Sequence, residues 1–455
     1  MIAQLLNRDF VLGQLAVVRA HLELDPGAFP ELLAEIVRTE RSETECSSGQ
    51  RGGVEPPPAE RRGGGSPELD DIAFFSRSPL VSLVQSALER YVIDHGLPTE
   101  ALDPPDPGRR AVPDLPAVAD QSLRGVELLT EPDGRRLFGA FELADVGWVA
   151  SMIAAGTRVV RGRHPFTPRP AGPRPMANRA RVVLVGDWGS GLPRARAVAA
   201  RMRTVLEDGM SRHLDQHVVH LGDVYYSGWD WEYDQRFLAH WPVATGEAGQ
   251  VSSWALNGNH DMYSGGDGYF GHLLADPRFA GQEGSSFFSL HNDDWEILGL
   301  DTAWDEGGLA DPQPAWVGER LAASGRRFVL LSHHQLVSAY QRPSPALGVA
   351  LGPMRASGRA RAWFWGHEHR CMHFRPHGGV AAPRCIGHGG VPSPMWRDHD
   401  EPYPAPASYE YRAQRWSGVE PWALFGFAVL DFDGPTIRVR YIDEDGTEHA
   451  NEELA

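Results

Sequence analysis

The sequence predicts an α/β fold in which two mixed β-sheets lie face to face with helices on their outer sides, a four-layer αββα sandwich. Two observations predict this fold. After about residue 180 the chain repeats a strand-like run, a polar loop and a helical segment. Several of these runs also end in turns rich in Gly, Asp, Asn or His. A mostly helical module is expected to precede the sandwich.

The first part of the chain, residues 1–164, is predicted to form this mostly helical module. Apolar residues at helical spacing mark three segments: 1–40, 80–93 and 141–160. Glu131-Pro132-Asp133-Gly134 is a turn signal and indicates a hairpin. Residues 42–67 are rich in Ser, Gly, Pro, Glu and Arg, so we expect a disordered loop there. The module carries no ligand cluster, phosphate loop or basic patch, and its sequence does not indicate a role.

A proline-rich connector, residues 165–180, leads to the predicted sandwich domain, residues 181–455. The expected strands are Arg181–Val185, His217–Leu221, Ser253–Leu256, Phe287–Leu290, Trp295–Leu300, Arg327–Leu331 and Ala362–Trp365. The expected helices are Arg194–Leu206, Trp231–His240 and Pro314–Ala323. Near the end, Phe425–Phe432 and Thr436–Ile442 flank Asp433-Gly434-Pro435 and predict a β-hairpin.

Five of the predicted strands run directly into potential metal ligands. These turns read Gly186-Asp187-Trp188-Gly189, Gly222-Asp223-Val224-Tyr225-Tyr226, Gly258-Asn259-His260-Asp261, Ser332-His333-His334 and Gly366-His367-Glu368-His369. Each turn alone is a weak signal, because Gly-Asp turns commonly cap helices and lone histidine pairs are commonly buried in cores. Gly-His-x-His is more specific, since residues i and i+2 of an extended stretch point the same way. Together, in this order, the five turns predict a metal site.

The ordered set resembles the calcineurin-type metallophosphoesterase superfamily and, within it, the purple acid phosphatases. The superfamily's usual first motif is Asp-x-His, but Gly189 stands at its third position here. Purple acid phosphatases share that gap and fill it with a tyrosine three residues after the second Asp, which is Tyr226 in this sequence. The resemblance extends from about Arg181 to Asp445. It implies a metallophosphoesterase domain over residues 181–455.

The resemblance implies two metal ions that share Asp223 as a bridging carboxylate. The implied ligands of the first ion are Asp187, Asp223, Tyr226 and His369. The implied ligands of the second ion are Asp223, Asn259, His333 and His367. A phenolate suits Fe(III), and carboxylate with imidazole suits Fe(II), Zn or Mn at the other position. Tyr225 is the alternative to Tyr226, and the motif spacing favours Tyr226.

Four further residues near these turns are candidates for work on the substrate. His260 is expected to bond a phosphate oxygen or to protonate the leaving alkoxide, with Asp261 orienting its ring. Packing under the metal loop is the alternative role for His260. His334 and His388 are weaker candidates for the substrate side, and each has a structural alternative. Gln335 stands where the superfamily often has Pro, which bears on the substrate-side geometry.

Composition narrows the classes of function. The chain has 455 residues and a formal net charge of −17, which argues against general nucleic-acid or anionic-membrane binding. Its three cysteines, Cys46, Cys371 and Cys385, are too few for a disulfide framework. We expect Cys371 and Cys385 to be buried free thiols, with a disulfide between them as the alternative. With no secretory start and no run of about 18 apolar residues, we expect a cytoplasmic protein without a membrane span, whereas many purple acid phosphatases are secreted.

The expected function is hydrolysis of a small phosphomonoester by a metal-bound hydroxide. Two nearby ions hold the phosphoryl oxygens and lower the pKa of bound water to roughly 7. A phosphodiesterase acting on cyclic or dinucleotide substrates is an alternative that the ligands do not distinguish, because loops around the cleft set substrate choice. A second alternative is a metal-stabilised interaction module with little activity, whose protein partner binds through residues 1–164.

Overall fold

The computed structural model describes the chain at residues 72–73, 128–130, 136–138, 163–191, 193–225, 227–339, 344–391, 407–416 and 421–455. The chain divides into two compact units. One unit comprises Met1–Val160, Pro394–Asp400 and Gln414–Trp422, and the other comprises Arg161–Ser393, Glu401–Ala413 and Ala423–Ala455. The predicted boundaries at residues 164 and 180 remain predictions.

Short strands are described in the first unit. They are β1 (Ile72–Ala73), β2 (Leu128–Thr130) and β3 (Arg136–Phe138), in the sheet order β1-β3-β2. β2 and β3 pair antiparallel, as a hairpin around the predicted turn at Glu131–Gly134 requires. β15 (Gln414–Trp416) and β16 (Pro421–Ala423) form a two-stranded sheet. The helices predicted in this unit and the loop at residues 42–67 lie outside the described residues.

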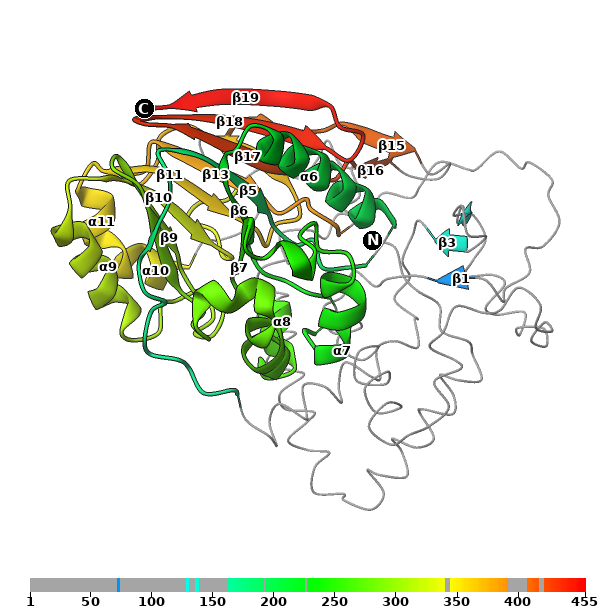
Figure 1. Cartoon of the computed structure of the whole chain (residues 1–455), viewed down its shortest axis with the longest axis horizontal. Coiled ribbons are helices and arrows are strands. Elements are labelled where there is room, and N and C mark those ends of the chain that lie inside the picture. The colour runs from blue at the N-terminus through cyan, green and yellow to red at the C-terminus, as the bar shows by residue number, and fades with distance from the viewer. Residues whose placement is uncertain are drawn as a thin grey trace, which may run out of the picture. The chain divides into compact units, whose positions relative to one another are not determined.

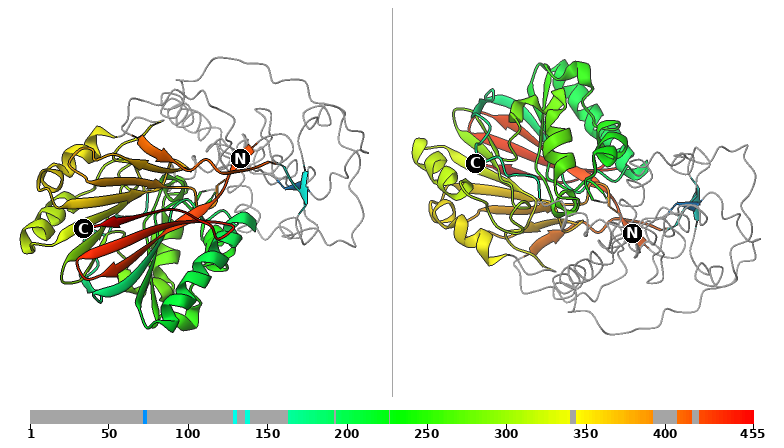
Figure 2. Two further views of the ribbon diagram at one scale, coloured as in Figure 1. Left: turned by 90° about the horizontal axis from the view of Figure 1, so that it is seen from above. Right: turned by 90° about the horizontal axis from the view of Figure 1, so that it is seen from below.

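The second unit contains two large mixed sheets (Figures 1 and 2). The six-stranded sheet has the order β19-β18-β17-β5-β6-β7. Its strands are β5 (Arg179–Val185), β6 (Asp215–His220), β7 (Val251–Ala255), β17 (Gly426–Asp433), β18 (Thr436–Asp443) and β19 (Glu448–Leu454). β5, β6 and β7 run parallel, and the other neighbours pair antiparallel. β17 and β18 are the predicted hairpin.

The eight-stranded sheet has the order β14-β12-β13-β11-β10-β9-β8-β4. Its strands are β4 (Arg174–Pro175), β8 (Phe288–His291), β9 (Trp295–Gly299), β10 (Arg327–Ser332), β11 (Ala360–Trp365), β12 (Cys371–Phe374), β13 (Ala382–Ile386) and β14 (Ala407–Glu410). β9, β10, β11 and β13 are parallel neighbours. Part of the predicted connector belongs to this sheet, because β4 pairs with β8.

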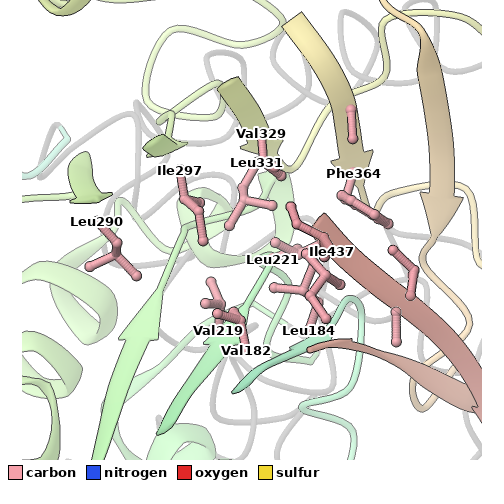
Figure 3. Close-up of a cluster of buried hydrophobic side chains, with 14 of the residues drawn as sticks. Val182, Leu184, Val219, Leu221, Leu290, Ile297, Val329, Leu331, Phe364 and Ile437 are labelled. Atoms are coloured by element: carbon pink, nitrogen blue, oxygen red, sulfur yellow. The ribbon is translucent and has the colours of Figure 1, made fainter. Parts of the chain in front are cut away.

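The main core lies between the inner faces of the two sheets (Figure 3). Val182, Leu184 and Val219 come from the six-stranded sheet, and Val329 and Phe364 come from the eight-stranded sheet. Alternate residues of the same strands are buried on the opposite, outer faces. Because both faces are covered, these strands read as continuous apolar runs rather than as alternating ones.

Helices cover the outer faces and complete the four predicted layers. α6 (Pro193–Ser211) contacts β6 and β17, and α9 (Gln313–Ala323), α10 (Pro345–Ala350) and α11 (Gly352–Ala356) lie beside the eight-stranded sheet (Figure 1). The connections around β7 carry short helices: α7 (Asp230–Glu232), α8 (Asn259–Tyr263), π-helices at Tyr233–Leu238 and Gly268–His272, and 3₁₀ turns at Thr245–Glu247, Leu273–Ala275 and Pro277–Gln282. The helix predicted at Trp231–His240 is α7 followed by the first π-helix.

The structure also describes the cysteines and the helices on which two other expectations depend. Cys371 and Cys385 are buried free thiols, as expected. Among the described residues, no helix has the length and apolar character needed to cross a membrane.

Candidate metal centre

The predicted ligands lie where strands of both sheets end. β5, β6 and β7 lead to Asp187, Asp223 and Asn259, and β10 and β11 lead to His333 and His367. Because β5, β6 and β7 are parallel neighbours, and β10 and β11 are too, their carboxyl ends lie together at one edge of each sheet. The fold therefore collects ligands from distant parts of the sequence.

One donor group is built around His333. Its Nε2 lies 2.9 Å from Asn259 Oδ1, 3.2 Å from His367 Nδ1 and 3.4 Å from Asp223 Oδ1. His333 Nδ1 lies 3.0 Å from the Leu221 carbonyl, which can only accept, so Nδ1 carries the proton and Nε2 presents a lone pair.

The side-chain amide of Asn259 is oriented toward the same group. Its Nδ2 donates to the Tyr263 hydroxyl at 2.7 Å, which turns Oδ1 toward the two imidazoles. The Asn259 amide oxygen, the Asp223 carboxylate and the His333 lone pair therefore converge without a donor among them. An amide oxygen, a carboxylate and an imidazole lone pair that converge in this way fit a metal ion.

A second donor group adjoins the first. The Tyr225 hydroxyl lies 3.1 Å from Asp187 Oδ1, 3.2 Å from Asp223 Oδ2 and 2.9 Å from His369 Nε2. His369 Nε2 is also 3.5 Å from Asp187 Oδ1. Two carboxylates and an imidazole thus surround one phenolic hydroxyl, and this group too is rich in potential metal ligands.

The charges of the two carboxylates support the same interpretation. Burial raises the pKa of Asp187 well above its ordinary value, and the negative charge of Asp223 adds to that rise. Burial acts in the same direction on Asp223, but the nearby His333, His260 and His367 outweigh it and hold the pKa of Asp223 below its ordinary value. A cation between the carboxylates would favour the ionised form of both.

Two of the assigned imidazoles, His367 and His369, are in the state that metal ligands require. Burial lowers the pKa of His367 well below its ordinary value and lowers the pKa of His369 to about 4. Both rings are therefore neutral near pH 7 and have a lone pair to offer.

The tyrosine in the second donor group differs from the predicted one. Motif spacing favoured Tyr226 as ligand and treated Tyr225 as its neighbour, whereas Tyr225 has its hydroxyl among Asp187, Asp223 and His369. Tyr226 lies outside the described residues. The role predicted for Tyr226 therefore stays a prediction.

Asp261, predicted to orient the His260 ring, accepts hydrogen bonds from groups of two neighbouring loops. Its Oδ2 accepts hydrogen bonds from the backbone N–H groups of Asp223 at 2.9 Å and Gly258 at 2.7 Å. Its Oδ1 accepts from the Val224 N–H at 2.9 Å and the Tyr233 hydroxyl at 2.6 Å. This fully buried carboxylate ties the loop after β6 to the loop after β7.

The two remaining histidines of the ligand turns lie close to the donor groups. The ring of His260 packs 4.4 Å from the ring of Tyr225, measured between centroids, and its backbone N–H donates to Asp223 Oδ1 at 2.9 Å. The ring of His334 lies 4.8 Å from that of His367, and its Nδ1 is 3.1 Å from the Thr302 hydroxyl. Thr302 carried no signal in the sequence, because its partner is distant along the chain.

His388, predicted as a substrate-side candidate, lies beside two other potential metal ligands. A ring nitrogen of His388 is within 4.8 Å of Cys371 Sγ and of a ring nitrogen of His449. Neither of those residues belongs to the two donor groups. The structure therefore places His388 in a separate cluster.

The backbone around the centre is unusual in two ways. Four non-glycine residues of the ligand turns are left-handed: Asp187, Asp223, His367 and His369, with φ from 44° to 71°. The neighbouring glycines leave room for the carboxylates. A Cβ on Gly258 would lie 2.0 Å from Asp223 Oδ1, and one on Gly366 would lie 2.4 Å from Asp187 Oδ2. Strained residues of this kind concentrate at functional sites.

Comparison with known proteins agrees with the resemblance seen in the sequence. Residues 180–371 match the family model described as calcineurin-like phosphoesterase. No curated protein matches the chain. Among solved structures, the chain is similar to GAP50, the anchor in the inner membrane complex of Plasmodium, at 11% identity and a TM-score of 0.45, over 61% of this chain and 88% of that chain.

Two other solved structures illustrate the range of the similarity. Purple acid phosphatase PPD1 from yellow lupin (Lupinus luteus) seeds is 17% identical with a TM-score of 0.41, over 63% of this chain and 55% of that chain. A single mutant of Vps29 from Entamoeba histolytica is 11% identical with a TM-score of 0.28, over 60% of this chain and 98% of that chain.

Proposed function

We propose, from the premise that residues 180–371 are a calcineurin-like phosphoesterase domain, that this protein is a phosphoester hydrolase with a binuclear metal centre. One observation carries the proposal. Asp223 Oδ1 lies 3.4 Å from His333 Nε2 in one donor group, and Asp223 Oδ2 lies 3.2 Å from the Tyr225 hydroxyl in the other. A carboxylate with one oxygen in each group is suited to bridge two cations and to offset their repulsion.

The donor groups suggest how the ions would be held. We assign Asp187, Asp223, Tyr225 and His369 to the first ion, and Asp223, Asn259, His333 and His367 to the second. Tyr225 replaces the predicted Tyr226. A tyrosinate with carboxylates suits Fe(III), and the second set suits Fe(II), Zn or Mn, a combination that would make the protein similar to purple acid phosphatases.

Bound ions would supply charge neutralisation of the phosphoryl oxygens and an activated water near neutral pH. The chain's own contribution is to hold donors and substrate in place. Asp261 fixes the loops that carry Asp223 and Asn259, and Leu221 fixes the His333 tautomer through its carbonyl. His260, beside Tyr225, is assigned to donate a proton to the leaving alkoxide or a hydrogen bond to a phosphoryl oxygen.

The substrate that we propose is a small phosphate monoester. The formal net charge of −17 opposes the approach of long polyanions, while two cations would attract a compact dianion locally. Cyclic or dinucleotide phosphodiesters are the alternative substrates. A metal-stabilised interaction module that binds a protein partner through residues 1–164 is the alternative without catalysis.

A hydrolysis panel combined with metal analysis separates these alternatives. The purified chain is loaded with iron, zinc or manganese and assayed with an aryl phosphate, a bis-aryl phosphate and a cyclic nucleotide. We expect about two ions at the centre and turnover of the aryl phosphate. Preference for either diester would instead indicate a phosphodiesterase, and a metal-loaded chain that is inactive on all three would contradict the hydrolase assignment.

Asp223→Asn is the matching variant, because an amide brings no negative charge to the bridge. It should lose both turnover and metal. Asp215→Asn is the control, since Asp215 lies at the opposite end of the same strand, β6, and accepts a hydrogen bond from the Ala177 N–H at 2.7 Å. Wild-type metal content and activity in Asp223→Asn would show that the centre is wrongly assigned.

A further inference from the structure

A second cluster of potential metal ligands lies outside the two donor groups. Cys371 begins β12, His388 follows β13, and His449 belongs to β19. The Cys371 Sγ and one ring nitrogen of each histidine all lie within 4.8 Å of one another. β12 and β13 belong to the eight-stranded sheet and β19 to the six-stranded sheet, so this cluster exists only when the sandwich has formed.

The polar atoms of this cluster lack partners that would explain their burial. His388 is 2% exposed, and within the described part of the chain neither of its ring nitrogens makes a hydrogen bond of ordinary geometry. The same holds for His449 Nε2 among the residues that the structure describes. Cys371 is a buried free thiol. A buried polar group without a hydrogen bond is destabilising, so two such rings beside one thiol indicate a site for a bound ion.

We propose that Cys371, His388 and His449 bind a zinc ion at a site separate from the binuclear centre. A thiolate with two neutral imidazoles is a common donor set for Zn²⁺. Around tetrahedral zinc, such ligand atoms stand about 3.3–3.7 Å apart, so side-chain movements of about 1 Å would complete the site. The fourth position would be left to water, reached from the side of the half-buried His449.

The surroundings of His449 prepare it as a ligand. Its Nδ1 lies 2.9 Å from the Tyr409 hydroxyl, so Nε2 is the nitrogen that we assign to the zinc ion. The ring of Tyr411 stacks on the imidazole with centroids 3.6 Å apart and planes 9° apart. Burial lowers the pKa of His449 to about 4 and that of His388 to about 3, so both rings keep their lone pairs near pH 7. Hydrogen bonds and stacking of this kind orient metal ligands before the ion arrives.

The proposed site adjoins the binuclear centre without sharing a residue with it. Cys371 follows His369 by two residues, and His388 follows Gly387, whose added Cβ would lie 2.8 Å from Asp187 Oδ2. An ion held by Cys371 and His388 would therefore fix the segments directly behind two of the assigned ligands. This would be a structural contribution to the hydrolase centre.

Cobalt loading of the full chain tests the zinc site, because a thiolate bound to Co²⁺ gives a charge-transfer band in the near ultraviolet. We expect that band in the wild type, with one ion more than the binuclear centre holds. Cys371→Ser should lose the band and that one ion, and zinc should displace the cobalt. Cys385→Ser and Cys46→Ser are matched controls that should keep the band, since Cys385 Sγ points to the Arg370 and Gly366 carbonyls.

Two more variants keep the test decisive. His449→Gln changes a half-buried side chain, so it should remove the band and leave the far-ultraviolet circular dichroism spectrum unchanged. This variant tests the zinc site even where Cys371→Ser does not fold. Asp223→Asn should lose the binuclear ions and keep the band, so failure of the proposed function is distinguishable from failure of this site. A wild type without a thiolate band, or a band that survives Cys371→Ser or His449→Gln, would overturn the proposal.

Discussion

Replacing Asp261 by asparagine tests whether this carboxylate holds the metal loops together or serves the chemistry of His260. The side chain is fully buried, and each of its two oxygens accepts two hydrogen bonds. Asparagine has the same shape but carries an NH₂ group in place of one oxygen. That group would face two donors, whichever way the amide is turned.

The magnitude follows from those contacts. The substitution removes two hydrogen bonds and leaves two donors buried without an acceptor, at about 1–3 kcal/mol for each donor. We therefore expect Asp261→Asn to lower the free energy of unfolding by about 2–6 kcal/mol. Tyr233→Phe is the graded control, because it removes one donor together with its bond to Asp261 and leaves no backbone N–H unpaired. It should cost about 1–2 kcal/mol.

Urea denaturation measures the free energy of unfolding of both variants, and metal analysis before unfolding measures their metal content. If Asp261 holds the loops after β6 and β7 together, Asp261→Asn is the less stable of the two variants and binds less metal. The reason is that the loops carrying Asp223 and Asn259 lose their common anchor. If the carboxylate instead oriented His260, Asp261→Asn would keep its stability and metal and lose only turnover. An unfolding free energy within 1 kcal/mol of the wild type would refute the reasoning.

Two further predictions concern the residues around the first ion. Tyr225→Phe should abolish the visible phenolate-to-iron absorption of the oxidised, iron-loaded protein and weaken the first ion, whereas Tyr226→Phe should leave the band in place. A band that disappears only in Tyr226→Phe would restore the motif spacing as the correct guide, and a colourless wild type would exclude Fe(III)–tyrosinate. His260→Ala should keep both ions and lower turnover of an aryl phosphate by roughly 10²–10⁴-fold. Loss of metal in that variant would make His260 a ligand or a structural support instead.

The sandwich was predictable because its central strands are buried on both faces. Continuous apolar runs such as Val182–Val185 and Phe328–Leu331 leave little choice of structure, and each ends at a polar turn. β19 was not predicted, because Glu448–Leu454 is a mostly polar segment at the edge of its sheet. Its pairing with β18 depends on backbone hydrogen bonds, which a hydrophobic pattern does not report.

The site was predictable to the level of its turns and less so at the level of side-chain directions. The five ligand turns are recognisable because each follows a strand, and the parallel order brings their ends together. Tyr225, whose hydroxyl lies beside Asp187 and Asp223, entered the sequence analysis only as the alternative to Tyr226. The cluster of Cys371, His388 and His449 had no local signal, since its members come from β12, from the turn after β13 and from β19.

The strain at the centre bears on how the ligands are held. Each left-handed residue among Asp187, Asp223, His367 and His369 costs of the order of 1–3 kcal/mol of conformational free energy. An isolated loop would therefore not hold all four in this conformation. Protein contacts offset that cost: Asp187 Oδ2 accepts the His367 N–H at 2.8 Å, and Asp223 Oδ1 accepts the His260 N–H at 2.9 Å. These bonds join turns from different strands, and in the case of Asp187 and His367 they join the two sheets. The ligand turns are thus fixed by the folded sandwich itself, which is the arrangement that a pre-organised centre requires.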